Sequence, residues 1–269
     1  KLGIVGVAYN TKIMAVKAGQ QTGIFNQSDI AEAIIYAWQN GADVINMSFG
    51  GVGLSIATED ALIAAYTRCV LVAAAGNNGM PNEPTPHYPE YLRDWAPTYP
   101  GALSYVVGVM SVSEYGVESG FTNWDYITQN YVEYETYAPG ERILSTFPGG
   151  RYVYLNGTSM ASPIVAGIAA LLRSYYTDRD MYPSRYIAAQ LSATSEERPY
   201  CLMSHDPHNV PMIVNAYDGL TKLPKPEVHL YDYYLNDNDD GYVDAGDTLE
   251  LGLVLRNRWG MSRDTVVTL

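Results

Sequence analysis

Cysteine, basic residues and long apolar runs are all scarce in this chain of 269 residues. The two cysteines, Cys69 and Cys201, define no disulfide framework, and we expect both to be free thiols. Lysine and arginine number 16 against 29 aspartates and glutamates, and the resulting net charge of −13 argues against nucleic-acid binding. No apolar run approaches the length of a membrane span. The 24 tyrosines give a polar-aromatic composition that agrees with a secreted, extracellular protein.

Histidine is scarce as well, and none of the four histidines lies in a motif typical of a catalytic base. His87 lies among prolines, in what we predict to be a surface loop. His205 and His208 fall in a polar Ser-His-Asp-Pro-His-Asn stretch, where adjacency in sequence carries no weight because the members of a catalytic triad meet in space. His229 lies further along the chain. We expect none of the four to be a catalytic base.

Strand and helix patterns alternate over the first part of the chain. A helical pattern at residues 28–41, capped by Ser28 or Asp29, precedes a buried-strand run at residues 44–47. A second helical pattern at residues 55–68 precedes a strand run at residues 70–75, and a further strand run follows at residues 105–112. Strands connected through helices imply right-handed crossovers and a parallel sheet that is covered on both faces. We therefore predict an α/β fold with a mostly parallel sheet flanked by helices. Its chemistry should lie beyond the carboxyl ends of the strands.

Two later stretches lack a periodic pattern. Residues 80–100 are rich in proline and predict an inserted surface loop. Residues 121–134 are rich in tyrosine and asparagine, and we predict a surface excursion there without a chemical role. A helical pattern returns at residues 186–191.

Residues 156–163, Asn-Gly-Thr-Ser-Met-Ala-Ser-Pro, are the most informative stretch, because a Gly-Thr-Ser turn opens directly into an apolar helical run at residues 164–172. This order places the Ser159 hydroxyl at a helix N-terminus, where unpaired N–H groups and the helix dipole favour negative charge. A nucleophilic serine that forms an anionic tetrahedral intermediate benefits from that location. An ordinary helix cap with a proline in the first turn would give the same pattern, so the motif alone leaves both interpretations open.

Two strand ends add polar groups and exposed backbone. The run at residues 70–75 ends in Gly76-Asn77-Asn78-Gly79, where the Asn77 amide is placed to donate to a developing oxyanion. The alternative is that Asn77 or Asn78 only adopts a left-handed turn. The run at residues 43–51 also leaves its strand on glycines, and exposed backbone there can pair with an extended peptide.

Taken in order, Ile-Asn-Met-Ser-Phe-Gly-Gly, Ala-Ala-Ala-Gly-Asn-Asn-Gly and Asn-Gly-Thr-Ser-Met-Ala-Ser-Pro resemble the subtilisin-like serine proteases, the subtilase family. The resemblance covers roughly residues 1–220. Residues 13–17 look like the family's strand after its histidine helix, residues 137–146 like its approach to the serine, and residues 214–217 like its closing segment.

The resemblance implies a serine endopeptidase that acts on peptide or protein substrates. Ser159 would be the nucleophile, and the Asn77 side chain and the Ser159 backbone N–H would form the oxyanion hole. The resemblance also implies a substrate-binding strand and a pocket for the residue before the cut. The strand would comprise Ser48, Phe49 and Gly50, and the pocket would be lined by Ala74 to Gly76. This chemistry requires no cofactor.

The chain departs from the family pattern at its triad. Family members carry aspartate, histidine and serine in that order, and no aspartate strand or His-Gly-Thr helix is present here. Either the aspartate and histidine are supplied by sequence absent from this chain, or the protein is a catalytically inactive, peptide-binding module. We favour a fragment, because residues 2–16 look like the interior of a domain and residues 266–269 look strand-like. The chain alone should be nearly inert. An α/β-hydrolase esterase would require Gly-x-Ser-x-Gly, which fails at Ala161.

Leu223-Pro-Lys-Pro marks a predicted boundary between a catalytic domain at residues 1–222 and a partial β module at residues 223–269. Strand-like runs at residues 228–235 and 248–257 make this second part resemble the start of an immunoglobulin-like β-sandwich. The acidic residues 236–247 between them match the ligand spacing of a calcium-binding loop, with Asn first and Asp last. An Asx-rich hairpin connection explains the same residues, and we favour it over a metal site.

Overall fold

The computed structural model describes residues 3–20, 23–81, 97–124, 134–197, 212–222, 228–236 and 250–257. In chain order its elements are α1 Gln27–Gln39, β1 Val44–Met47, α2 Ile56–Tyr66, β2 Val70–Ala74, β3 Val107–Val112, β4 Thr136–Pro139, β5 Ile143–Phe147, β6 Arg151–Leu155, α3 Thr158–Tyr175, α4 Ser184–Ala193, β7 Glu196–Glu197, β8 Met212–Ile213, α5 Ala216–Thr221, β9 Val228–Asn236 and β10 Glu250–Asn257.

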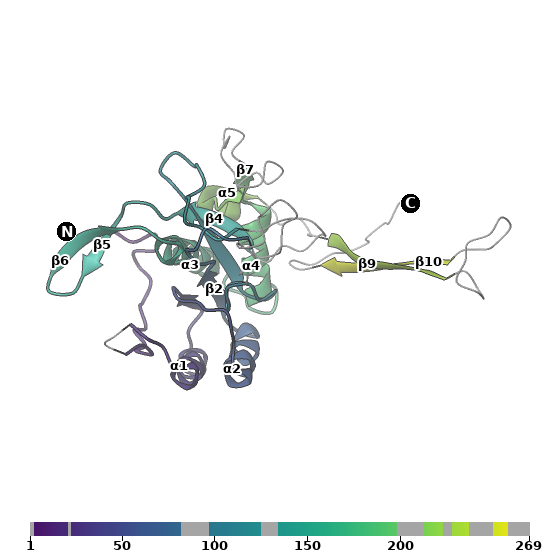
Figure 1. Cartoon of the computed structure of the whole chain (residues 1–269), viewed down its shortest axis with the longest axis horizontal. Helices are drawn as coiled ribbons and strands as arrows, with labels where there is room; N and C mark the ends of the chain where they lie inside the picture. The colour runs from purple at the N-terminus through teal and green to yellow at the C-terminus, as the bar shows by residue number, and fades with distance from the viewer. Residues whose placement is uncertain are drawn as a thin grey trace.

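A six-stranded sheet in the order β1-β2-β3-β4-β8-β7 forms the centre of the fold (Figure 1). The pairs β1–β2, β2–β3, β3–β4 and β4–β8 are parallel, and only the short β7 is antiparallel to its neighbour. The predicted mostly parallel α/β fold is confirmed. Asn77 and Ser48 both lie just beyond the carboxyl ends of neighbouring strands, as the sequence predicts.

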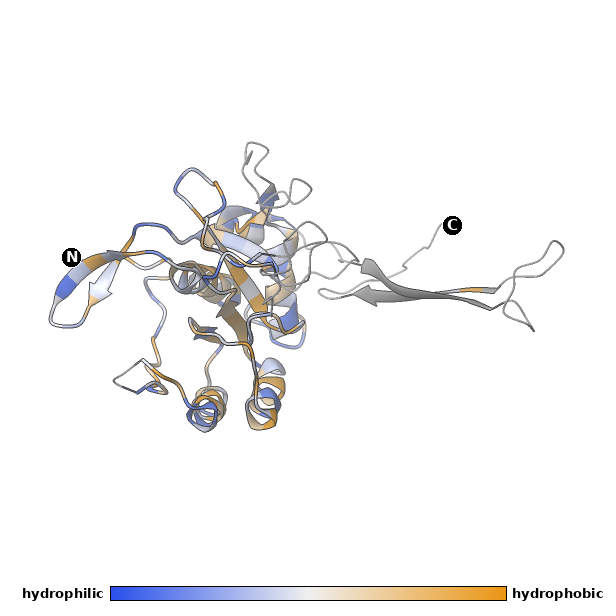
Figure 2. Ribbon diagram, viewed as in Figure 1, coloured by the Kyte–Doolittle hydropathy of each residue, from blue (hydrophilic) through white to orange (hydrophobic). Residues whose placement is uncertain are grey.

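Alternating side chains of β2 hold the helices on the two faces of the sheet. Val70 and Val72 pack into a core with α3 and α4, whereas Leu71 and Ala73 pack into a second core with α1 and α2. Since successive side chains of a strand point to opposite faces, one continuous apolar run supplies both cores. Figure 2 shows the apolar colouring of the central strands.

The predicted helices form, with one shifted start. Ser55 caps α2 by accepting a hydrogen bond from Thr58 N at 3.2 Å, as expected for a serine N-cap. Helix α1 begins earlier than predicted, and its N-cap is Asn26 instead of Ser28 or Asp29. The Asn26 amide donates to the Asp29 carboxylate at 3.1 Å. Ser28 and Asp29 therefore lie in the first turn of α1, after its N-cap.

Residues 13–17, which the resemblance likens to a strand, form no strand in the described part of the chain. The segment runs over the surface, and the side chain of Ile13 is 91% exposed. A single extended segment without a hydrogen-bonding neighbour is not stable as a strand, and no described strand pairs with this one.

Two other segments differ from their predictions. The surface excursion predicted at residues 121–134 is wrong at both described ends, because Thr122, Asn123, Trp124 and Tyr134 are buried. Residues 125–133 and 82–96 lie outside the described residues. The described end of the proline-rich stretch is not a free loop either, because Tyr99 and Gly51 exchange both backbone hydrogen bonds.

The strands β5 and β6 form an antiparallel hairpin that carries the chain toward Ser159 (Figure 1). Gly149 and Gly150 turn the hairpin with positive φ angles of 80° and 70°. After β6, the Asn156 side-chain oxygen accepts a hydrogen bond from Arg142 N at 2.7 Å, which fixes the exit of the hairpin. The chain therefore enters Gly157 from a defined direction.

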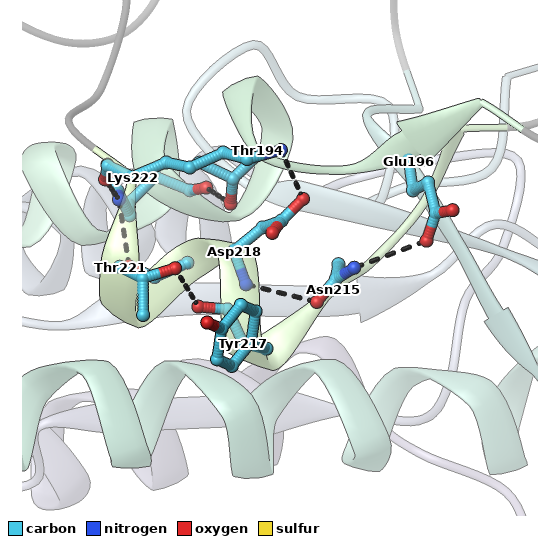
Figure 3. Close-up of polar contacts among 9 residues, drawn as sticks. Thr194, Glu196, Asn215, Tyr217, Asp218, Thr221 and Lys222 are labelled. Carbon is cyan, nitrogen blue, oxygen red and sulfur yellow. Dashed lines mark hydrogen bonds and ion pairs between the residues drawn. The ribbon is translucent and has the colours of Figure 1, made fainter.

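Helix α5 closes the sheet domain against α4 (Figure 3). Asn215 caps this helix by accepting from Asp218 N at 3.1 Å, and its amide donates to Glu196 at 3.2 Å. The buried Gln190 of α4 donates to the carbonyl of Gly219 at 2.8 Å. These contacts give the predicted closing segment, residues 214–217, a structural role at the end of the domain.

Beyond this helix, β9 and β10 pair as an antiparallel two-stranded sheet, which confirms the two predicted strands. The β-sandwich itself and the boundary at residue 222 stay predictions. The acidic connection falls almost entirely outside the described residues, so the choice between a calcium loop and an Asx-rich hairpin also stays open. None of the helices described has the length and apolarity that crossing a membrane requires.

Candidate active site

The start of helix α3 positions Ser159. The helix begins at Thr158, with Gly157 as its N-cap, so Ser159 is the second helical residue, as predicted. Gly157 N donates to Gly140 O at 2.9 Å, which ties the cap to the end of β4. The apolar face of α3, which includes Val165 and Leu172, is buried against the sheet. This burial holds the helix N-terminus still relative to the strand ends.

Asn77 lies against this helix start. Its side-chain oxygen accepts hydrogen bonds from Thr158 N at 2.8 Å and from Thr158 Oγ1 at 3.0 Å. Thr158 Oγ1 in turn accepts from Gly76 N at 3.2 Å. With its oxygen engaged on Thr158, the residue that precedes Ser159, the Asn77 amide keeps its Nδ2 group as a donor.

The alternative role for the asparagines, a left-handed turn, is wrong. Among the described non-glycine residues only Arg142 has a positive φ, while Gly76 and Gly79 on either side of the pair adopt φ angles of 108° and 63°. The glycines therefore make the turn, and Asn77 is free to serve through its side chain.

Ser48, which follows β1, forms two hydrogen bonds with Ser159. Ser159 Oγ donates to the Ser48 carbonyl oxygen at 3.1 Å, and Ser48 Oγ donates to the Ser159 carbonyl oxygen at 2.9 Å. The three sequence segments that carry the resemblance thus converge on one point, although Asn77 and Ser159 are far apart in sequence.

The two segments predicted to bind substrate flank a partly buried Thr98. A Cβ atom on Gly50 would lie 2.5 Å from Thr98 Cγ2, and one on Gly76 would lie 2.8 Å from Thr98 Oγ1. Both positions therefore require glycine. Ala74 is buried at the end of β2, where it pairs with Val109 of β3, and the partly buried ring of Phe49 packs against the core of α1 and α2 and stacks on Phe25 at 4.8 Å.

Asn123, which no sequence motif indicates, braces the Asn77 loop. Its side-chain oxygen accepts from Asn78 N at 2.9 Å and from Met80 N at 3.2 Å, and its amide donates to Thr98 Oγ1 at 3.0 Å. The side chain is 3% exposed. A polar residue buried with each of its groups paired is a structural brace, so the described residue Asn123 of this stretch does contribute to the site.

A base for Ser159 is not among the described side chains. His87, His205 and His208 lie outside the described residues, and only the backbone of His229 is described, in β9. The described residues also contain no cluster of histidine, cysteine, aspartate and glutamate suited to a metal ion. Cys69 is a buried free thiol, as predicted, and burial together with Asp43 raises its pKa to about 11; Cys201 lies outside the described residues.

Comparisons with known proteins agree on one family. A family model described as the subtilase family matches residues 1–217. The thermophilic serine proteinase of Bacillus sp. (strain AK1) is 42% identical over 174 residues, which cover 64% of this chain and 38% of that protein. Subtilisin DY of Bacillus licheniformis is 39% identical over 175 residues, which cover 65% of this chain and 58% of that protein. The chain thus spans less than two thirds of the length of these relatives.

Solved structures of proteases also match this chain. Proteases from Pseudoalteromonas arctica PAMC 21717 match with a TM-score of 0.66 and 31% identity, over 81% of this chain and 65% of that one. A cold adapted subtilisin-like serine proteinase matches with a TM-score of 0.64 and 26% identity, over 80% of this chain and 72% of that one.

Proposed function

The chain belongs to the subtilase family of serine peptidases, and from this premise we propose that it carries the nucleophile and the oxyanion hole of a serine endopeptidase. Ser159 is the proposed nucleophile, and the Asn77 amide and the Ser159 backbone N–H are the proposed oxyanion donors. The histidine and aspartate come from sequence outside these 269 residues.

The contact between Asn77 and Thr158 carries the proposal. Two hydrogen bonds, of 2.8 Å and 3.0 Å, hold the Asn77 oxygen on the residue that precedes Ser159. These bonds restrain the Asn77 side chain before any substrate arrives, which supports a preorganised amide donor at this site. Donors held in place in this way stabilise developing charge without reorganisation during the reaction.

In the proposed reaction, Ser159 Oγ bonds to the carbonyl carbon of the scissile peptide while its proton passes to the histidine. The carbonyl electron pair moves to the oxygen, which the Asn77 amide and the Ser159 N–H stabilise at the positive end of α3. The histidine then gives its proton to the leaving amine, and water releases the acyl group. Because every group is a protein side chain or backbone amide, no cofactor is required.

The base is proposed to lie outside the chain because Ser159 Oγ donates to the Ser48 carbonyl and no histidine side chain is described near it. The exposed apolar residues of the N-terminal segment support the packing of further chain against it, since Ile4, Val5 and Val7 are all exposed as well as Ile13. Taken alone, the 269 residues should hydrolyse peptides barely faster than the Ser159→Ala variant.

The proposed substrate is an extended peptide or protein. Its backbone would pair with residues 48–50, and its side chain before the cut would enter a pocket lined by residues 74–76. The acidic, tyrosine-rich composition supports a secreted, extracellular enzyme acting on protein.

A fluorophosphonate probe tests this function, because it reacts with an activated serine and not with an ordinary one. In the protein expressed from its complete gene, we expect labelling at Ser159, located by peptide mass spectrometry, and none in the Ser159→Ala variant. Folded full-length protein that binds peptides but is never labelled would instead be the inactive, peptide-binding module.

A further inference from the structure

Helix α3 contains a proline, Pro163, within its first two turns. In an α-helix the carbonyl of residue i accepts from the N–H of residue i+4. The partner of the Ser159 carbonyl would be residue 163, and proline has no N–H to donate. The carbonyl of the proposed nucleophile therefore lacks its usual helical donor, and it needs a substitute wherever water does not reach it.

Ser48 provides that substitute. Its Oγ donates to the Ser159 carbonyl oxygen at 2.9 Å, across 111 positions of sequence. The same hydroxyl accepts from Asn46 Nδ2 at 2.9 Å, so its only proton is directed at Ser159. A hydroxyl with one donor group and a fixed acceptor contact has little freedom to turn elsewhere.

Asn46 is oriented in turn by the helix itself. Its side-chain oxygen accepts from Ser162 Oγ at 2.6 Å, and Ser162 is fully buried in α3. The hydrogen bonds therefore run in one direction, from Ser162 to Asn46, then to Ser48, and back to Ser159 in the first turn of the same helix.

We propose that Asn46 and Ser48 are positioning residues for Ser159, which replace the helical donor that Pro163 removes and fix the peptide of the nucleophile. This inference rests on the proposed function. Holding the Ser159 carbonyl restrains the peptide on the C-terminal side of its Cα atom, and with it the position of the Cα–Cβ bond that carries Oγ. Geometry of this kind affects the chemical step more than substrate binding.

Ser48→Ala removes the substitute donor. In full-length protein we expect kcat on a chromogenic peptide to fall about 3- to 10-fold, as for the loss of one net hydrogen bond, with KM little changed. Asn46→Asp should have a similar effect, because a carboxylate accepts the Ser48 proton and draws it away from Ser159.

Pro163→Ala provides the decisive control, because alanine returns an N–H to the position that faces the Ser159 carbonyl. We expect the Ser48→Ala/Pro163→Ala double variant to recover most of the kcat lost in Ser48→Ala. If Ser48→Ala acted only through a general loss of packing at residue 48, the Pro163→Ala substitution in α3 would not restore kcat. Urea unfolding of the parent, the two single variants and the double variant should show the same coupling. Ser48→Ala should cost more stability in the parent than in the Pro163→Ala background.

The outcomes separate the two claims. If the parent is labelled at Ser159 but Ser48→Ala keeps the parental kcat, or the double variant keeps the full deficit, the positioning role is wrong while the proposed function stands. If the folded parent is neither labelled nor active, the proposed function and the catalytic role of Asn46 and Ser48 both fail.

Discussion

Replacing the buried Asn123 by leucine should lower the stability of the sheet domain, because Asn123 holds the loop that carries Asn77. Leucine has the same branched side-chain skeleton as asparagine but forms no side-chain hydrogen bonds. The substitution removes the bonds to Asn78 N, Met80 N and Thr98 Oγ1 together. The neighbouring turn cannot absorb the change easily, because Gly76 already holds a positive φ of 108°.

The expected cost follows from counting these bonds. Each contributes about 1 kcal/mol net, which gives about 3 kcal/mol for the three. Asn78 is exposed and its N–H can bind water instead, so we expect a loss of about 2 to 3 kcal/mol. Thr98→Val, which removes only the third bond and keeps the side-chain shape, should cost about 1 kcal/mol or less.

Urea unfolding of the 269-residue chain, followed by circular dichroism, measures both variants against the parent. At an unchanged m-value, the midpoint should fall clearly for Asn123→Leu and slightly for Thr98→Val. A parental midpoint for Asn123→Leu, or equal losses for the two variants, would refute the bracing role assigned to Asn123.

Three further predictions concern stability. Gly157→Ala should cost about 1 to 3 kcal/mol in urea unfolding, because φ 150° and ψ 156° belong to a region that only glycine adopts freely, and the new Cβ meets nothing closer than 3.5 Å. Leu172→Ala should cost about 2 to 5 kcal/mol by the same assay, since this α3 side chain is fully buried in the core that the helix shares with the sheet. An unchanged midpoint would show that Leu172 does not contribute to that core. Burial and Asp43 raise the pKa of Cys69 from 9.0 to about 11, so the native state binds more protons than the unfolded state between these pH values. Stability should therefore be fully present below pH 9 and fall as the pH rises toward 11, and Cys69→Ala should reduce that slope in urea midpoints measured from about pH 8 to 11.

The sequence was sufficient to predict the convergence of Ser48, Asn77 and Ser159. The first two follow the carboxyl ends of neighbouring parallel strands, and the third begins a helix whose apolar face must cover the same sheet. Local patterns and topology together determine where such residues meet.

Asn123 and Thr98 could not be predicted in this way. Their roles depend on contacts between segments that are distant in sequence and carry no periodic pattern, so nothing local distinguishes them from loop residues. The β5–β6 hairpin is a different case. Gly149-Gly150 between two β-prone runs is a recognisable hairpin signal, although the serine motif that follows it is far more conspicuous.

The most direct measurement is a crystal structure of the full-length protein after reaction with a fluorophosphonate. We predict a phosphorus atom bonded to Ser159 Oγ, with its free oxygen about 2.7 to 3.1 Å from both Asn77 Nδ2 and Ser159 N. A phosphonyl group attached to another residue, or one whose oxygen points away from Asn77, would contradict the shared site.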